Sequence, residues 1–181
     1  MTHVSGIAPP GTLGPSFEEP FEMLQACHQR IERMLALLEK VRSHMRASGA
    51  DENTRQSARD VMRYFDKAAP QHHRDEELHV FPALIGMQDE ALVRLVAQLQ
   101  AEHQLMDARW RSARSLLEEV EGGMRSRFNE ADDAVLDEFA SIYAEHMRAE
   151  EGTAFPRASA AMDPERVKVM SADMMSRRGV T

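Results

Sequence analysis

The chain contains one pattern twice: a lone histidine, then a His-x-x-x-Glu-Glu motif, and then a Phe-Pro pair. The two lone histidines lie 75 residues apart and the two motifs 74 residues apart. A duplication of this kind predicts two equivalent helical hairpins, related by a pseudo-twofold axis, whose matching residues approach that axis from opposite sides. The copies are His28, His72, Glu76, Glu77, Phe81 and Pro82 in the first half, and His103, His146, Glu150, Glu151, Phe155 and Pro156 in the second.

Apolar residues recur every three or four positions through most of the chain, which is the spacing of one helical face. Breaks rich in Gly, Ser and Asp at 48–51, 86–89 and 122–123 separate four such stripes, and Asp51 suits an N-cap. Asp163-Pro164 has the signature of a further helix start, which predicts a short helix to about Arg178. The four stripes run from Phe17 to Leu38, from Met62 to Ala83, from Leu92 to Leu117 and from Val135 to Glu150.

These elements predict an all-α protein, folded as an up-down-up-down four-helix bundle with short connections. We expect a flexible N-terminal arm at 1–16, the bundle at 17–160, and a short C-terminal helix and tail at 161–181. Pro70 interrupts the second stripe, because an interior proline removes a backbone hydrogen bond and kinks a helix. We interpret it as a local bend that aims the side chains after it, and a helix break is the competing interpretation.

Composition excludes several classes of function. The 22 Lys and Arg against 30 Asp and Glu leave a net charge of −8, which argues against a nucleic-acid partner. The single cysteine excludes an internal disulfide and any site built from several thiolates. No apolar run approaches the roughly 20 residues that span a bilayer, and the first 20 residues lack the pattern of a secretion signal. We therefore expect a cytoplasmic protein with neither a nucleic-acid nor a membrane partner.

Six ionisable side chains of the repeat lie on the apolar stripes, so we expect them to point into the core. A His and a Glu at positions i and i+4 lie about 5–6 Å apart on one helical face, so both can ligate one metal ion or the carboxylate can bridge to a second. Burying them all without a partner would be very costly, and a pair of metal ions is the economical explanation. The predicted ligands are His28, His72, Glu76, His103, His146 and Glu150.

His73 and Glu77 form the same motif one residue out of register. The repeat aligns His72 with His146, whereas it aligns His73 with Met147, and this favours His72 as the ligand. We therefore expect His73 and Glu77 to be a solvated pair, or to lie behind the ligands and orient them.

The types of ligand indicate the metal. Imidazole and carboxylate ligands suit iron, with manganese as the second choice. Two octahedral ions need about 12 coordination positions, of which four imidazoles and two bridging carboxylates fill about eight. The remainder leaves room for a solvent-derived bridge and at least one position for a small molecule.

The order of these residues resembles the hemerythrin-like family, also called the HHE cation-binding domain. Its motif is His, His-x-x-x-Glu, His and His-x-x-x-Glu on four successive helices, and the resemblance covers about 17–160. It implies a non-haem di-iron centre in a four-helix bundle. Such centres bind dioxygen or, in some members, serve iron, nitric oxide or peroxide responses.

One departure from the family bears on function. The oxygen-carrying hemerythrins place a fifth histidine one turn after the third-helix histidine, where this chain has Asp107, whose mate in the repeat is Glu32. Both are candidates for additional carboxylate ligands, or for acceptors that orient His28 and His103. His79 is a candidate substitute for the fifth histidine, although it has no mate in the repeat. The departure argues against simple oxygen carriage.

The resemblance and the open position predict a protein that binds dioxygen or nitric oxide at iron, as a sensor, scavenger or store, rather than an enzyme. A di-iron oxidase or peroxidase is the first rival, because Glu32 and Asp107 would enrich its site in carboxylates. An iron-buffering protein without turnover is the second. Tyr143, one turn before His146, is expected in the core, with a hydrogen bond to a bound ligand as the other interpretation.

Overall fold

The computed structural model describes residues 17–180, so the predicted arm at 1–16 lies outside the described residues. Within 17–180 the protein is all-helical and contains no strand, as the sequence predicted. None of the described helices is long and apolar enough to cross a membrane. The elements are α1 (Pro20–Ala47), α2 (Glu52–Asp75), η1 (Glu76–Val80), α3 (Phe81–Ile85), α4 (Glu90–Glu121), α5 (Glu130–Ala140), α6 (Ile142–Ala149), η2 (Glu150–Ala154), α7 (Phe155–Ala161) and α8 (Pro164–Arg177), where η marks a π-helix.

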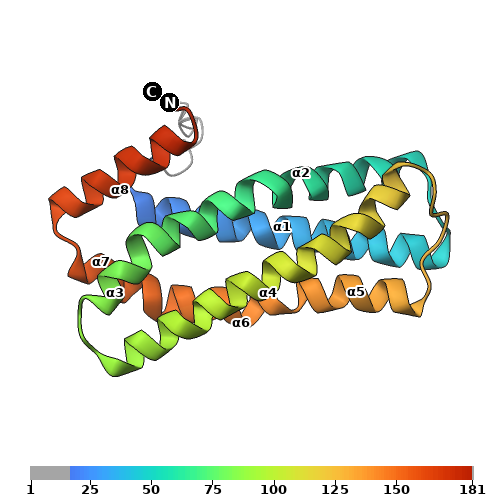
Figure 1. The fold of residues 1–181 in the computed structure, drawn as a ribbon. Coiled ribbons are helices and arrows are strands. Elements are labelled where there is room, and N and C mark those ends of the chain that lie inside the picture. The colour runs from blue at the N-terminus through green and yellow to red at the C-terminus, as the bar shows by residue number, and fades with distance from the viewer. Residues whose placement is uncertain (1–16, 181) are drawn as a thin grey trace, which may run out of the picture.

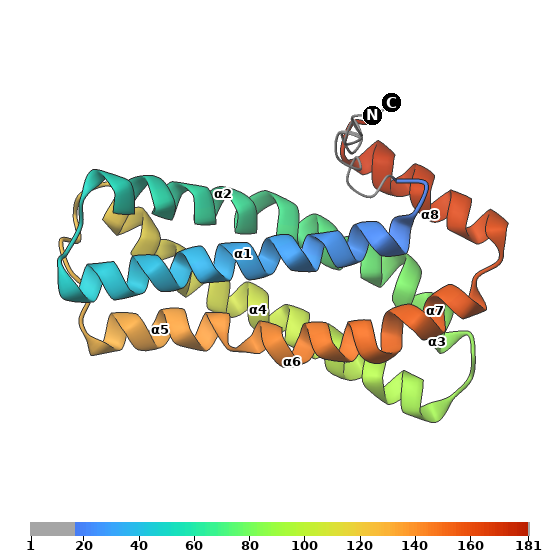
Figure 2. The ribbon, with the colours of Figure 1, turned by 180° about the vertical axis from the view of Figure 1, so that it is seen from behind.

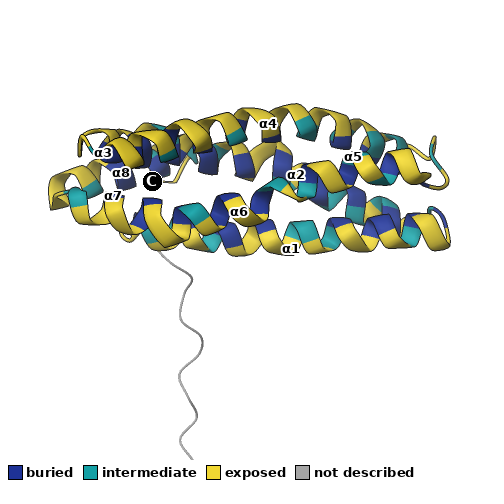
Figure 3. Ribbon diagram, turned by 90° about the horizontal axis from the view of Figure 1, so that it is seen from below, coloured by how far each residue is buried: buried dark blue, intermediate teal, exposed yellow. Residues whose placement is uncertain are grey.

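The long helical segments lie side by side, and successive segments run in opposite directions (Figures 1 and 2). α1 packs against α2, α2 against α4, α4 against α5 and α6, and α5 against α1. Buried residues face the space between the helices and exposed residues face outward (Figure 3). α8 lies at one end of the molecule, where it contacts α1 and α2.

Short polar side chains begin the helices, largely where the sequence places them. The predicted breaks at 48–51, 86–89 and 122–123 all interrupt helices, which confirms them. Asp51 and Asp163 each accept a hydrogen bond from the backbone N–H three residues ahead, at 2.7 and 2.9 Å. Such a cap satisfies one of the backbone donors that the first helical turn leaves without a partner.

Two details of the predicted helices are wrong, and one competing interpretation is excluded. The first helix begins at Pro20 rather than Phe17, because proline fits the first helical turn, where no N–H is needed. α2 runs unbroken through Pro70, so a helix break there is excluded; Pro70 is exposed, and water can reach the carbonyl that it leaves without a donor. The fourth stripe divides into α5 and α6 at Ser141, whose hydroxyl bonds to the carbonyl of Glu138 at 3.3 Å.

A π-helical turn follows each His-x-x-x motif at the same place in both halves, and the apolar periodicity of the sequence does not predict it. η1 begins at Glu76 and η2 at Glu150, and each closes with a backbone hydrogen bond five residues on, to Glu76 from Phe81 and to Glu150 from Phe155. A proline follows directly in each half, and it has no N–H for the regular i to i−4 bond. The repeated Phe-Pro pair is therefore the signal in the sequence that accompanies this change of helical register.

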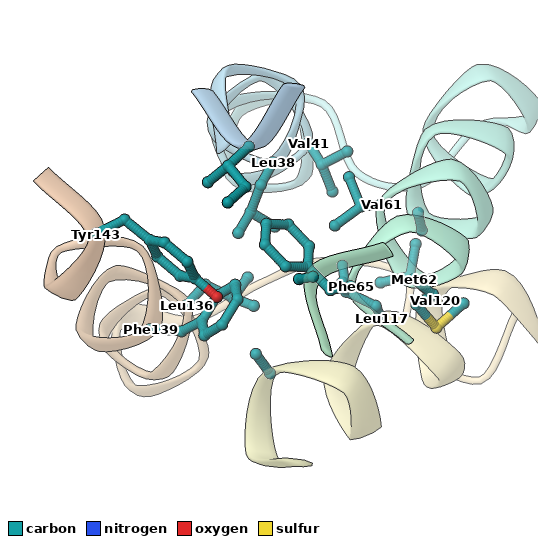
Figure 4. Close-up of a cluster of buried hydrophobic side chains, with 14 of the residues drawn as sticks. Leu38, Val41, Val61, Met62, Phe65, Leu117, Val120, Leu136, Phe139 and Tyr143 are labelled. Carbon is teal, nitrogen blue, oxygen red and sulfur yellow. The ribbon is translucent and has the colours of Figure 1, made fainter. Parts of the chain in front are cut away.

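Two apolar clusters fill the interior, one on each side of a polar layer. Along α1, Leu24 belongs to one cluster and Ile31 to the other, and His28 lies between them. The same order holds on α4, where His103 lies between Leu99 and Met106. In the cluster that contains Ile31, the rings of Phe65, Phe139 and Tyr143 point toward one another from α2, α5 and α6, with centroids 5.0 to 5.7 Å apart (Figure 4).

A buried ion cluster holds α8 against the end of α2. Asp75 is fully buried, and its two carboxylate oxygens lie 2.5 Å from the guanidinium groups of Arg177 and Arg178. Arg177 also binds Asp173, which pairs with His79 at 2.7 Å. Because Asp75 directly precedes Glu76, this cluster ties the C-terminal helix to the start of η1.

Replacing both Arg177 and Arg178 by Met is expected to destabilise the protein by about 3 kcal/mol, because a buried Asp75 loses its partners. Thermal unfolding of the full chain measures the effect. The matched control is Lys168→Met on α8, whose exposed pair with Glu165 is worth less than about 1 kcal/mol. Equal unfolding temperatures for the double variant and the control would contradict the role given to the cluster.

Candidate metal centre

The structure brings all six predicted ligands together at the middle of the polar layer. Each is at most 3% exposed. Their donor atoms form two sets, and within each set the atoms lie within 4.8 Å of one another. The first set is His28, His72, Glu76 and Glu150, and the second is Glu76, His103, His146 and Glu150.

Each carboxylate spans the two sets. Glu76 places Oε1 3.2 Å from Nε2 of His72 and Oε2 3.4 Å from Nε2 of His103. Glu150 also spans the two sets. Its Oε2 lies 3.2 Å from Nε2 of His28, and its Oε1 lies 3.1 Å from Nε2 of His146. The shared carboxylates and the separate imidazoles make two adjacent four-donor positions, one for each half of the duplication.

Several inward-facing atoms of the centre have no hydrogen-bond partner within residues 17–180. They are Nε2 of His28 and both carboxylate oxygens of Glu76 and of Glu150. Buried polar atoms are almost always satisfied, and leaving a buried carboxylate unsatisfied is very costly. A divalent cation at each position would satisfy all of them, so the residues fit a pair of metal ions.

Burial shifts the pKa values of Glu76 and His72 toward the neutral forms of these groups, whereas Glu150 shifts the other way. Burial, and then the charge of Glu150, raises the pKa of Glu76 well above its usual range. Burial, and then the neighbouring His28, lowers the pKa of His72 well below its usual value. Burial acts to raise the pKa of Glu150, but the neighbouring imidazoles of His146 and His28 outweigh it, so that the pKa is lowered. Without a cation, the centre therefore keeps a proton on Glu76 beside the ionised Glu150.

Three carboxylates orient the histidines from the outer side. Glu151 lies 2.7 Å from Nδ1 of His28, Glu77 lies 3.2 Å from Nδ1 of His103, and Glu102 lies 2.7 Å from Nδ1 of His146. Such partners fix the ring orientation and leave Nε2 free to face a metal. Glu77 was predicted in this role, whereas Glu102 and Glu151 were missed, although the repeat aligns Glu151 with Glu77.

His72 is the exception among the four histidines. Its Nδ1 is buried and has no hydrogen-bond partner among the described residues. The repeat position that would match Glu102 is Cys27, a buried thiol whose pKa burial raises. The chain therefore lacks a carboxylate at the place where the second half supplies one.

The other candidates from the sequence lie outside both donor sets. His73 is buried at 8% exposure and stacks on His103 with ring centroids 4.0 Å apart, which excludes the solvated alternative for His73 and leaves the alternative that it lies behind the ligands. Its burial and the neighbouring His103 lower its pKa well below the usual value. Glu32 and Asp107 are exposed, and His79 pairs with Asp173 instead. Tyr143 is buried in the apolar cluster, as expected.

Twin His and Glu sets inside a helical fold define the class of a metal-binding helical protein. A family model described as the hemerythrin HHE cation-binding domain matches residues 19–158, and the chain belongs to this family. The chain is also 28% identical over 136 residues to an uncharacterized protein of Haemophilus influenzae, covering 75% of this chain and 77% of that protein. Family and site together indicate a protein that binds metal ions.

Metal binding is expected to release a proton and to strengthen as pH rises. The raised pKa of Glu76 means that this carboxyl carries a proton in the metal-free protein, and a bound cation must displace it. The dissociation constant for Mn²⁺ should therefore fall as pH increases through that pKa. Titration calorimetry in two buffers of different ionisation heat counts the protons, and a dissociation constant that does not change with pH would contradict the prediction.

Loss of the carboxylate at Glu102 is expected to weaken one of the two metal positions. The Glu102→Ala variant leaves Nδ1 of His146 without its acceptor, and such changes typically lower metal affinity about 10- to 100-fold. Stepwise chelation of the loaded protein measures this as earlier loss of one ion. Glu118→Ala, on the exposed face of the same helix, is the matched control and should behave as the unchanged protein.

Proposed function

We propose that the protein holds two iron ions between His28, His72, Glu76, His103, His146 and Glu150, and that it binds a small ligand at an open iron position. The ligand is dioxygen or nitric oxide, and the role is sensing, scavenging or storage rather than turnover. Manganese is the second choice of metal. The observation that carries the proposal is that both oxygens of Glu76 and of Glu150 are buried, unpaired and divided between two donor sets.

The number of donors supports the open position. Each set offers two imidazoles and one oxygen from each of two carboxylates, which is four donors. An octahedral ion takes about six, so each ion retains room for solvent and for one exogenous molecule. The proposal includes an up-down-up-down four-helix bundle at 17–160 as the domain that carries the centre, and a cytoplasmic location.

The rival functions rest on weaker observations. An oxidase or peroxidase with a carboxylate-rich site drew on Glu32 and Asp107, and both lie outside the donor sets and are exposed. An iron buffer needs no open position and no dedicated path for a small molecule. The three functions differ in what the reduced iron protein does when it meets oxygen.

The full chain, reconstituted with iron without oxygen, is expected to contain about two iron ions, one for each four-donor set. Stopped-flow spectra on mixing with dioxygen or nitric oxide should then show a stable ligand-to-metal band that disappears when the ligand is removed. Transient bands with product formation would support the oxidase instead. Absence of any band despite full iron would support the buffer.

Substitution tests the register of the ligands. His72→Ala and Glu150→Ala are expected to lose iron, because each removes a donor that faces the centre. His73→Ala is expected to retain it, because His73 belongs to neither set. The opposite result, iron kept by His72→Ala and lost by His73→Ala, would overturn the assignment. Iron content near zero in the unchanged protein would overturn the proposed function itself.

A further inference from the structure

The C-terminal helix α8 lies beyond the part of the chain that the family model matches. The match covers residues 19–158, whereas α8 spans Pro164–Arg177. Met170 and Met174 of α8 are fully buried and belong to the same apolar cluster as Val80, the last residue of η1. The apolar side of this additional helix is therefore part of the core next to the metal centre.

Ion pairs join α8 and the residue that follows it to both sides of the inward glutamate of η1. The guanidinium groups of Arg177 and Arg178 lie 2.5 Å from the fully buried carboxylate of Asp75, the residue directly before this glutamate. Asp173 lies 2.7 Å from Nε2 of His79, three residues after the glutamate. The polar side of α8 is therefore attached to the same short segment of the chain that presents a proposed metal ligand.

The second half of the duplication has no counterpart of these ion pairs. The repeat aligns Asp75 with Ala149 and His79 with Thr153, and neither of the latter is charged. η2 nevertheless forms the same π-turn and presents Glu150 to the centre. A π-turn with a shared carboxylate therefore needs no such ion pairs, and what they add in the first half is the attachment of α8.

The centre and α8 hold the same segment, residues 75–81, from opposite sides. On the inner side, the two oxygens of Glu76 have no hydrogen-bond partner among the described residues, so this side is held when cations satisfy them. Phe81, at the end of the segment, stacks on His103 with ring centroids 5.6 Å apart. Two partners that favour one conformation of a shared element strengthen each other's binding, and the coupling is equal in both directions.

We propose that α8 and Arg178 form a latch whose closure on η1 depends on the metal occupancy of the centre. The latch stays docked when the centre holds iron and opens more readily when the centre is empty. Opening exposes the buried faces of Met170 and Met174 to solvent and frees Arg177 and Arg178 from Asp75. This inference rests on the proposed function and gives its sensing role an output, which reports whether iron is bound.

Hydrogen exchange of the full chain tests the coupling from metal to latch. The iron-loaded and metal-free proteins are compared without oxygen, and mass spectrometry follows the backbone amides of α8. Iron is expected to slow their exchange by about 5- to 150-fold, the usual range of coupling between two sites. α5, at the opposite end of the molecule from α8, is the internal control and should change far less (Figure 2). Equal slowing in both helices would overturn the latch, because it would indicate general stabilisation.

Affinity for the ferrous ion tests the coupling from latch to metal. Replacing both Arg177 and Arg178 by Met is expected to weaken ferrous binding, measured by calorimetry without oxygen, by a factor similar to the slowing of exchange, because coupling is reciprocal. The matched control is Arg42→Met, which takes a buried arginine away from Asp133 on α5. This control removes an ion pair that does not involve η1 or α8, and it should leave the ferrous affinity unchanged.

A milder variant keeps the test independent of the double substitution. Asp173→Asn retains the shape of the side chain and the pairing of Asp75, but it removes the charge that faces His79. It is expected to speed the exchange of α8 in the iron-loaded protein and to weaken ferrous binding less than the double variant does. If the double variant does not fold, Asp173→Asn decides.

The outcomes separate the latch from the proposed function. A ferrous affinity that is unchanged in the α8 variants, in a chain that takes up two iron ions, would overturn the latch while the proposed function stands. A loss of affinity in Arg42→Met as large as in the double variant would also overturn the latch, since it would reflect general destabilisation. An unchanged protein that takes up no iron would overturn the proposed function and the latch with it.

Discussion

The close burial of Glu76 and Glu150 at the middle of the fold is the constraint on which the rest of the structure depends. Both carboxyl groups are fully buried, and their four oxygens lack hydrogen bonds within the described residues. Two such groups at one place repel each other and lose their hydration, which an apolar core alone cannot offset. The four surrounding histidines, and the cations that we propose between them, offset this cost. The apolar clusters on either side then stabilise the helices that carry it.

The π-turns belong to the same constraint. A regular helix would set successive carboxylates about 100° apart, and only one of them would face the axis. In each half a π-turn begins at the inward glutamate, and the next glutamate reaches across to a histidine of the other half, from Glu77 to His103 and from Glu151 to His28. The wider π-turn thus lets two consecutive glutamates take part in one site. The first faces the centre, and the second contacts a histidine from the outer side. The π-turn disrupts the regular i to i−4 hydrogen bonds of the helix next to a proline, which has no N–H to make such a bond in any case.

Much of the fold and most of the centre were predictable, because helical periodicity and an internal repeat are strong local signals. The repeat selected His72 over His73, and the structure places His72 in a donor set. Glu102 and the burial of His73 were not predictable in the same way, since both depend on contacts between helices. Glu102 reaches His146 from 44 residues away, and His73 is buried by stacking on a helix that no local pattern places beside it. The π-turns were missed because a 3.6-residue period hides one inserted residue.

Divergence of the two halves explains more of the chemistry than their likeness does. An exact duplication would make two equal metal positions, with the same outer carboxylates and the same approach for a ligand. Two of the pairs of positions at which the halves differ lie beside the centre, Cys27 against Glu102 and Met147 against His73. In both pairs, the donor set of His103 and His146 has the polar side chain as its neighbour, and the other donor set has the sulfur-containing side chain. A carboxylate makes His146 a stronger donor than His72, so the two proposed ions differ in their hold on the protein.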